Sequence, residues 1–259
     1  MARRKRFDEA AGTVIGGVLA GLAAVRRGKA VHPDGVVHEA RLVVSGLAAA
    51  PAGARLLREP GEYRAVVRFS RSLGVPRPLP DLLGISIRVL EPFERGRHQD
   101  FLLVTSVDRP ILHHVFVPAS DVQQRIYTSS LPYRAGDQRF LVGVLPRDQS
   151  PRGVGRTEFD RLATAAATGE LAFDVAVASV EGRFTPVAEL RIGDRLPAAF
   201  DALRFNPWNT GADLEPAGWL NGARRRAYEL SQRAWGRSQR DGERRQREAE
   251  VALSRLVAS

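Results

Sequence analysis

The stretch GISIRVL, residues 84–90, decides the fold class because apolar and small or polar residues alternate along it. This period of two is typical of a β-strand with one buried face. Three further short runs of β-branched and apolar residues, separated by Gly, Pro and Asp, predict strands at 40–47, 63–70 and 100–106. The first half of the chain is therefore predicted to be mostly β-structure.

A second group of strands follows later in the chain. Residues 171–180 and 183–192 predict an antiparallel hairpin that turns at Glu181 and Gly182. Pro186 lacks a backbone N–H, so it is expected at an edge or bulge position of the sheet.

Two predicted helical regions accompany the predicted strands, one between them and one at the C-terminal end of the chain. Residues 157–170 predict a helix with Thr157 as its N-cap and Gly169 as its stop, and the chain reads as helical from Pro216 onward. Many strands of similar spacing followed by a helical tail favour an antiparallel sheet closed into a barrel, with helices packed outside. The predicted fold class is α+β.

Composition excludes several classes of function. The chain has 259 residues, 44% of them apolar, and no cysteine, which rules out disulfides, thiolate nucleophiles and cysteine-ligated metal centres. The formal charge of +10 comes mostly from arginines mixed with acids along the chain, and no nucleic-acid-binding motif accompanies it. We therefore expect a cytoplasmic protein with no nucleic-acid partner.

The N-terminus begins with MARRKR and continues into an apolar stretch, residues 10–25. Asp8 and Glu9 interrupt the basic region and no convincing cleavage site follows, which argues against a signal peptide. We expect an apolar helix within 1–28 that packs on the domain. Association with a membrane through residues 10–25 is the alternative.

Individual residues of chemical interest have ordinary structural explanations when each is taken alone. Arg224 and Tyr228, within NGARRRAYELSQR (221–233), are four residues apart and share one face of a helix. His32, in KAVHPDG (29–35), precedes the strands, and single histidines are more often structural than catalytic. The adjacent His113 and His114 would face opposite ways in a strand and could not share a metal.

Taken in order, these segments resemble the haem catalase family. The resemblance covers about residues 29–235 and is carried by KAVHPDG, VVRFS, DLLGISIRV, DFLLVTS, FDVAVASVEGRFTPV, RFNPWN and RRRAY. It implies a small catalase-related protein that binds haem b and its iron. It also implies a catalase-like barrel core over 29–215 and a C-terminal helical segment, 216–259, that carries the proximal ligand.

The resemblance implies that the iron ligand is Tyr228. A tyrosine has a pKa near ~10 in water, so binding as phenolate requires positive charge nearby, which Arg224 supplies. Lys29 and Arg68 match the basic residues that lie near the haem propionates, and a lysine there lacks the bidentate fork of an arginine.

On the other side of the iron, the resemblance assigns His32 as the distal histidine, a general acid and base toward peroxide. Ser70 matches the residue that hydrogen-bonds this imidazole, and Val31 would narrow the channel beside it. Catalytic roles are therefore predicted for His32 and Ser70.

The chain departs from the family pattern at the distal asparagine, which falls on Val104, with Thr105 and Ser106 as the nearest polar residues. We therefore expect a peroxidase that acts on hydrogen peroxide or organic hydroperoxides with a small-molecule reductant, and that has weak or no catalase activity. The alternative is a non-catalytic catalase-fold protein that binds haem or another small ligand. Either protein is compatible with a homo-oligomer.

Overall fold

A computed structural model describes residues 34–129, 131–212, 214–217 and 240–258 of the chain. Its strands are β1 (Asp34–Val44), β2 (Gly61–Arg71), β3 (Leu83–Val89), β4 (Gln99–Thr105), β5 (Tyr127–Thr128), β6 (Tyr133–Ala135), β7 (Gln138–Pro146), β8 (Ala172–Ala178), β9 (Thr185–Arg195) and β10 (Glu215–Pro216). Its α-helices are α2 (Arg55–Arg58), α3 (Glu158–Ala166) and α5 (Arg240–Ala258), and its 3-10 helices are η1 (Leu112–His114) and η2 (Ala198–Ala202).

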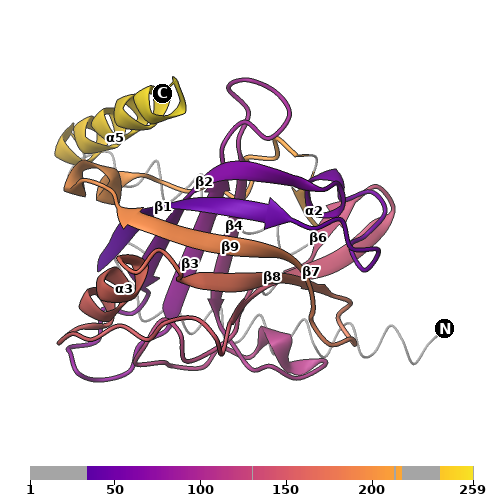
Figure 1. The fold of residues 1–259 in the computed structure, drawn as a ribbon, viewed down its shortest axis with the longest axis horizontal. Coiled ribbons are helices and arrows are strands. Elements are labelled where there is room, and N and C mark those ends of the chain that lie inside the picture. The colour runs from indigo at the N-terminus through magenta and orange to yellow at the C-terminus, as the bar shows by residue number, and fades with distance from the viewer. Residues whose placement is uncertain (1–33, 130, 213, 218–239, 259) are drawn as a thin grey trace.

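The strands close into an antiparallel barrel (Figure 1). Neighbours in the sheet follow the order β10-β6-β7-β5-β4-β3-β2-β1-β9-β8, and β8 pairs with β7 as well as with β9. In the described part of the chain, β6 and β10 extend the sheet beyond this closed ring. The α+β fold with an antiparallel barrel and a C-terminal helix is therefore confirmed, whereas the predicted N-terminal helix lies outside the described residues.

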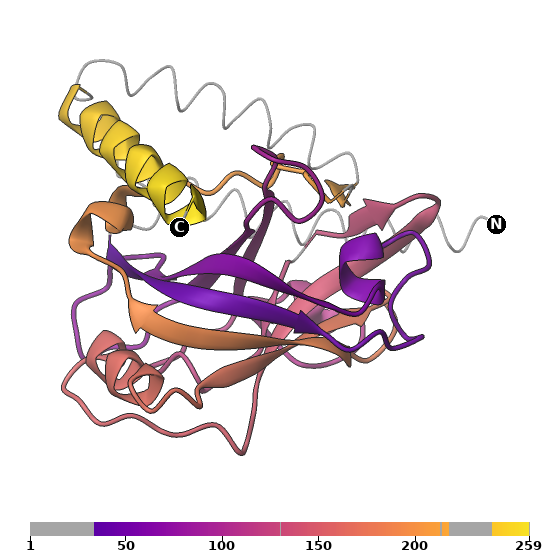
Figure 2. The same ribbon diagram turned by 45° about the horizontal axis from the view of Figure 1, so that its top comes forward.

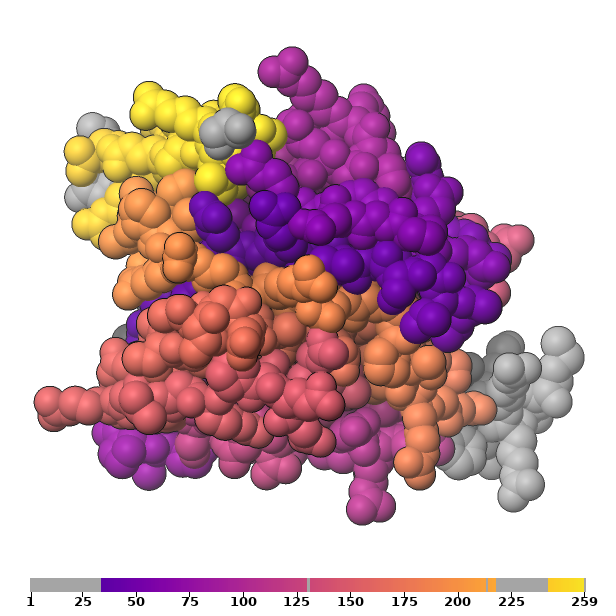
Figure 3. Space-filling view, in the orientation of Figure 1, coloured from indigo at the N-terminus to yellow at the C-terminus, as the bar shows by residue number. Residues whose placement is uncertain are grey.

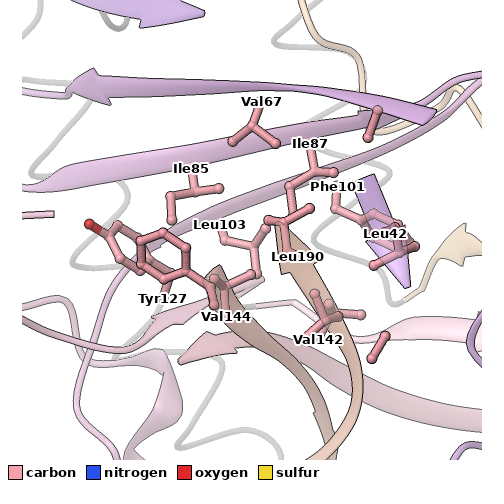
Figure 4. Packing of buried hydrophobic residues seen from close by; sticks show 14 of the residues in the cluster. Leu42, Val67, Ile85, Ile87, Phe101, Leu103, Tyr127, Val142, Val144 and Leu190 are labelled. Carbon is pink, nitrogen blue, oxygen red and sulfur yellow. The ribbon is translucent and has the colours of Figure 1, made fainter. Parts of the chain in front are cut away.

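The inside of the barrel is filled by apolar side chains from alternate positions of the strands (Figure 4). Leu42, Val67, Ile85, Phe101 and Tyr127 are among the residues that meet there, and all are almost completely buried. Because side chains of a strand alternate between its two faces, the residues between them point out of the barrel. This alternation defines an outer face on β1 to β4.

Part of that outer face is covered by a second apolar cluster, which joins the barrel to the C-terminal helix. Val37 and Val66 pack there with Phe200 of η2 and with Ala249 and Leu253 of α5. Figures 2 and 3 show α5, in yellow, beside the orange segment that contains η2. Within the described residues, no helix is long and apolar enough to span a membrane, and residues 10–25 are not among them.

Helix α3 begins as the sequence predicts. The Thr157 side chain accepts a hydrogen bond from the Asp160 backbone N–H, and the Asp160 side chain accepts one from the Thr157 N–H. These two bonds satisfy N–H groups that would otherwise lack partners at the helix start. The helix ends at Ala166, and Gly169 follows with a φ of 73°.

Several predicted boundaries differ from the observed ones. Strand β1 begins at Asp34 rather than at residue 40, because its N-terminal half pairs with β2 even though it contains polar residues. Strand β7 was not predicted, since LVGV is a continuous apolar run without alternation. Pro186 pairs with Ala176 next to a register shift, so the predicted bulge is confirmed. Residues 215–216 form strand β10 rather than the start of a helix.

Candidate functional site

Two of the predicted site residues lie on the outer face of β2, among neighbours that the sheet register places beside them. The residues that point inward at this level are Phe69, Ile85 and Leu103. On the outward side, Ser70 pairs with Gly35 of β1 and with Gly84 of β3, and Gly84 pairs in turn with Val104 of β4. Ser70, Gly84 and Val104 therefore form one row across the barrel surface.

The next row along the same face contains the other described site residue, Arg68. Arg68 pairs with Val37 on β1 and with Ser86 on β3, and Ser86 pairs with Leu102 on β4. All except Val37 are half-buried. The two rows together make a surface with one cation, two hydroxyls and an apolar edge, which we call the outer-face site.

The Arg68 guanidinium lies close to Gly35. A Cβ built on Gly35 would be 3.0 Å from Nε and 3.1 Å from Nη2 of Arg68. Burial lowers the pKa of Arg68, whereas the carboxylates of Asp201 and Asp34 raise it. The site therefore holds a partly desolvated positive charge, which favours an anionic group of a ligand.

The Ser70 side chain is buried, and its hydroxyl is 3.5 Å from the carbonyl oxygen of Gly84, the limit of a weak hydrogen bond. Its predicted bond to His32 remains a prediction, because His32 lies outside the described residues.

The register also decides which polar residue near Val104 faces the site. Thr105 points into the barrel, where its Oγ1 accepts a hydrogen bond from Leu83 N (3.2 Å) and donates one to Val117 O (2.7 Å). Ser106 is 1% exposed, and its Oγ has no hydrogen-bond partner within the described chain. Val104 is thus the residue beside Ser70 and Gly84, and Thr105 is excluded from the site.

One end of the outer face is fixed by a buried ion pair that was not predicted. Both nitrogens Nε and Nη2 of Arg88 donate to the two carboxylate oxygens of Asp100 at 2.8 Å. The same carboxylate accepts hydrogen bonds from Asn206 N (2.7 Å) and Asn209 Nδ2 (3.0 Å). The RFNPWN segment is therefore anchored to β3 and β4, which explains its polar residues structurally.

Asp81 and Gly84, which begin and end the DLLG start of the DLLGISIRV segment, have a structural role as well. Asp81 is buried, and its carboxylate accepts hydrogen bonds from Leu73 N (2.8 Å) and Val75 N (3.1 Å). Arg71 lies 3.4 Å from the same carboxylate and 3.1 Å from that of Glu158 in α3. These contacts hold the β2–β3 loop, so that Gly84 enters β3 opposite Ser70.

Five of the predicted site residues lie outside the described residues, so their roles remain predictions. They are Lys29, Val31, His32, Arg224 and Tyr228. Among the residues that are described, no group of three His, Asp or Glu side chains forms a metal site.

The adjacent histidines have separate environments. They lie in η1 rather than in a strand, and His113 is buried while His114 is half-buried. His113 Nε2 donates to the carbonyl oxygen of Gly182 at 2.9 Å. The burial of His113 and this hydrogen bond give it a structural role, which is the usual role of a single histidine.

A cavity of about 870 Å³ opens at the far end of the outer face, between α5 and the β3–β4 loop. Arg88 and Asn206 line it. Arg88 is two residues from Ser86 along β3, or about 7 Å at the usual rise of a strand. The cavity therefore begins next to the Arg68 row of the outer-face site, and Leu253, which lines it, packs in the same cluster as Val37.

A closed antiparallel barrel with helices against its outer face defines the class of fold. Within that class the fold is catalase-like: the structure matches a fungal catalase with a TM-score of 0.53 and 13% identity, over 78% of this chain and 57% of that chain. Catalase A from Saccharomyces cerevisiae is similar at a TM-score of 0.49 and 12% identity, over 77% of this chain and 59% of the other.

The chain thus spans less than two thirds of the length of the catalases that it matches. No protein-family model and no curated protein sequence matches it. At this identity the similarity establishes the fold alone.

Proposed function

We propose that this protein is a haem b-dependent peroxidase of catalase-like fold, which reduces hydrogen peroxide or organic hydroperoxides and has weak or no catalase activity. The observation that carries the proposal is the convergence of Arg68, Ser70 and Val104 on one outer face. Two of these residues match the family pattern, and the third replaces its distal asparagine. The order of motifs in the sequence supports the same assignment.

The described residues fit the proposed cofactor. Arg68 offers a partly buried guanidinium to a carboxylate, and the space above Gly35 leaves room for that guanidinium. Gly84 and Val104 pair in the same row and add apolar groups beside Ser70, which suits contact with a macrocycle. Lys29 would bind the second carboxylate, and Tyr228, with Arg224 beside it, would ligate the iron.

Haem, when bound, supplies two-electron redox chemistry to the reaction. The protein supplies the proton transfers: His32 takes a proton from the hydroperoxide and returns it to the oxygen that leaves when the O–O bond breaks. Ser70 holds the imidazole for that transfer. A small organic reductant provides two electrons and two protons, so that the products are an alcohol, or water, and a second molecule of water.

Val104 limits this chemistry to peroxidase turnover. Oxidation of a second hydrogen peroxide to dioxygen requires that molecule to be held in a defined position, and a valine side chain cannot hydrogen-bond it. The absence of a hydrogen-bonding side chain at Val104 also fits the alternative function, a non-catalytic catalase-fold protein that binds haem or another small ligand. Membrane association through residues 10–25 is a separate proposal that Val104 does not bear on.

The test is an assay of purified protein expressed with added haem. We expect oxidation of a phenolic reductant that depends on hydrogen peroxide or cumene hydroperoxide. The His32→Ala variant should retain haem and lose most of the rate, since acid–base assistance is worth about a hundredfold or more. Haem-loaded protein that oxidises no reductant with either peroxide would favour the non-catalytic alternative.

A further inference from the structure

Gly35, the last residue of the KAVHPDG segment, packs closely against the neighbouring strand. A Cβ at this position would be 2.7 Å from the carbonyl oxygen of Phe69, in addition to its contacts of 3.0 and 3.1 Å with the Arg68 guanidinium. Normal separations between non-bonded heavy atoms are about 3.5–4.0 Å. Any other amino acid at Gly35 would therefore displace the guanidinium, the strand, or both.

The requirement for glycine at this position comes from space and not from backbone conformation. The glycines with a positive φ are Gly46, Gly74, Gly96, Gly136 and Gly169 in the described residues, and Gly35 is not one of them. An L-residue could adopt its backbone angles without strain. Glycine leaves space for the carbonyl oxygen of Phe69 and, beside it, for the Arg68 guanidinium to lie over β1.

Burial lowers the pKa of the Arg68 guanidinium, and the carboxylates of Asp201 and Asp34 raise it. Asp34, which precedes Gly35, also accepts a hydrogen bond from Arg77 Nη2 at 2.8 Å. Asp201, the other carboxylate that acts on Arg68, receives hydrogen bonds from Val37 N (3.2 Å) and Arg195 Nη2 (3.1 Å). Each of these two carboxylates thus also accepts hydrogen bonds from residues other than Arg68.

We propose that Gly35 is a positioning residue: because it has no side chain, the Arg68 guanidinium lies across β1, where it binds a carboxylate of the cofactor. The inference rests on the proposed function for the identity of that carboxylate. It also gives a physical reason for the glycine that ends the KAVHPDG segment, three residues after His32. Gly35 acts through Arg68 and touches no substrate.

The first experiment examines the haem-free protein and needs no cofactor. The Nε–Hε resonance of Arg68 is assigned in ¹⁵N-labelled protein from its absence in Arg68→Lys. We expect Gly35→Ala to shift this resonance and to speed its exchange with water. The matched control is Gly193→Ala, because a Cβ on Gly193 meets Glu39 at an ordinary 3.5 Å. An unchanged Arg68 resonance in Gly35→Ala would overturn the proposal.

The second experiment measures binding of hemin and of hemin dimethyl ester, in which both carboxylates are blocked. Gly35→Ala should weaken hemin binding by about tenfold or more, as expected for a displaced charge-assisted hydrogen bond, and should weaken ester binding much less. In the Arg68→Leu background, Gly35→Ala should cause little further loss. Equal losses for the two ligands, or additive losses in the double variant, would show that Gly35 does not act through Arg68.

Two outcomes separate this inference from the proposed function. If the unmodified protein binds no hemin, the proposed function fails, and the NMR comparison alone decides whether Gly35 positions Arg68. If Gly35→Ala does not fold, the double variant Gly35→Ala/Arg68→Ala should recover folding. Failure of that double variant to fold would mean that the Phe69 carbonyl requires the glycine, and would overturn the proposal.

Discussion

Ser70 and Val104 stand on either side of Gly84, because both residues pair with it in the antiparallel register. Gly84 has no side chain, so no β3 side chain lies between the hydroxyl of Ser70 and the isopropyl group of Val104. The polar group that Thr105 offers points the other way, into the barrel. This row is where the distal chemistry of the proposed peroxidase differs from that of a full catalase.

The first prediction follows from that row. Val104→Asn should increase dioxygen release from hydrogen peroxide, since an amide beside Ser70 can hold the peroxide that is being oxidised. The control is Leu102→Asn, which places the same amide one row away on the same face. Both are measured with an oxygen electrode at millimolar peroxide. Vigorous dioxygen release by the unmodified protein would show that another group already performs this role.

The second prediction compares two neighbouring hydroxyls. Ser106 Oγ is buried with no hydrogen-bond partner in the described part of the chain, so Ser106→Ala should stabilise the protein by about 1 kcal/mol. Thr105→Val removes the hydrogen bonds to Leu83 N and Val117 O and should destabilise it by about 1–3 kcal/mol. Urea unfolding midpoints measure both changes, and a loss of stability in Ser106→Ala would contradict the assignment.

The third prediction concerns the buried pair of Arg88 and Asp100. Arg88→Met leaves the Asp100 carboxylate buried without its cation and should cost about 3–5 kcal/mol. Replacing both residues, as Arg88→Met/Asp100→Leu, should restore part of that stability. Urea denaturation provides the measurement. An Arg88→Met variant as stable as the unmodified protein would show that the pair does not anchor the RFNPWN segment.

The fourth prediction is a dependence of stability on pH through His38. Its side chain is fully buried, and Nδ1 donates to the carbonyl oxygen of Gly193 at 3.0 Å. Burial lowers the pKa of His38, as does the charge of Arg195, while the Gly193 hydrogen bond, Asp194 and Asp201 raise it. In the fold the imidazole is therefore neutral over a wider range of pH than in the unfolded chain.

The sign of the effect follows from proton binding. Below about pH 6.5 the unfolded chain takes up a proton on His38 that the folded protein does not, so stability falls as the pH falls toward the lowered pKa. His38→Leu should reduce this slope in unfolding experiments between about pH 5 and 7. An unchanged slope would mean that other groups cause the dependence.

The barrel strands with alternating patterns could be predicted from the sequence, as GISIRVL and the residues around Ser70 show. The pattern also predicted the Thr157 cap, because capping depends on residues three apart. It missed the N-terminal half of β1, where the buried His38 is a polar residue on the inward face. It missed β7 because a strand buried on both faces does not alternate.

Contacts between distant segments could not be predicted. The pairing of Arg88 with Asp100 depends on the register of a hairpin with a long loop, and the alternation only places Arg88 on the outer face. Arg71 and Glu158 meet across 87 residues of sequence, in contacts that only the folded barrel creates. The contact of Gly35 with Arg68 likewise depends on the pairing of β1 with β2, which the KAVHPDG segment alone does not reveal.

Haem binding can be measured by titrating the purified, haem-free protein with hemin. We expect a Soret band and an endpoint of about one haem per chain, with a high-spin ferric spectrum typical of tyrosine ligation. Tyr228→Phe should weaken haem retention and change that spectrum, whereas His32→Ala should retain haem. A titration without an endpoint, in protein that also stays colourless after expression with added haem, would contradict the proposed haem binding.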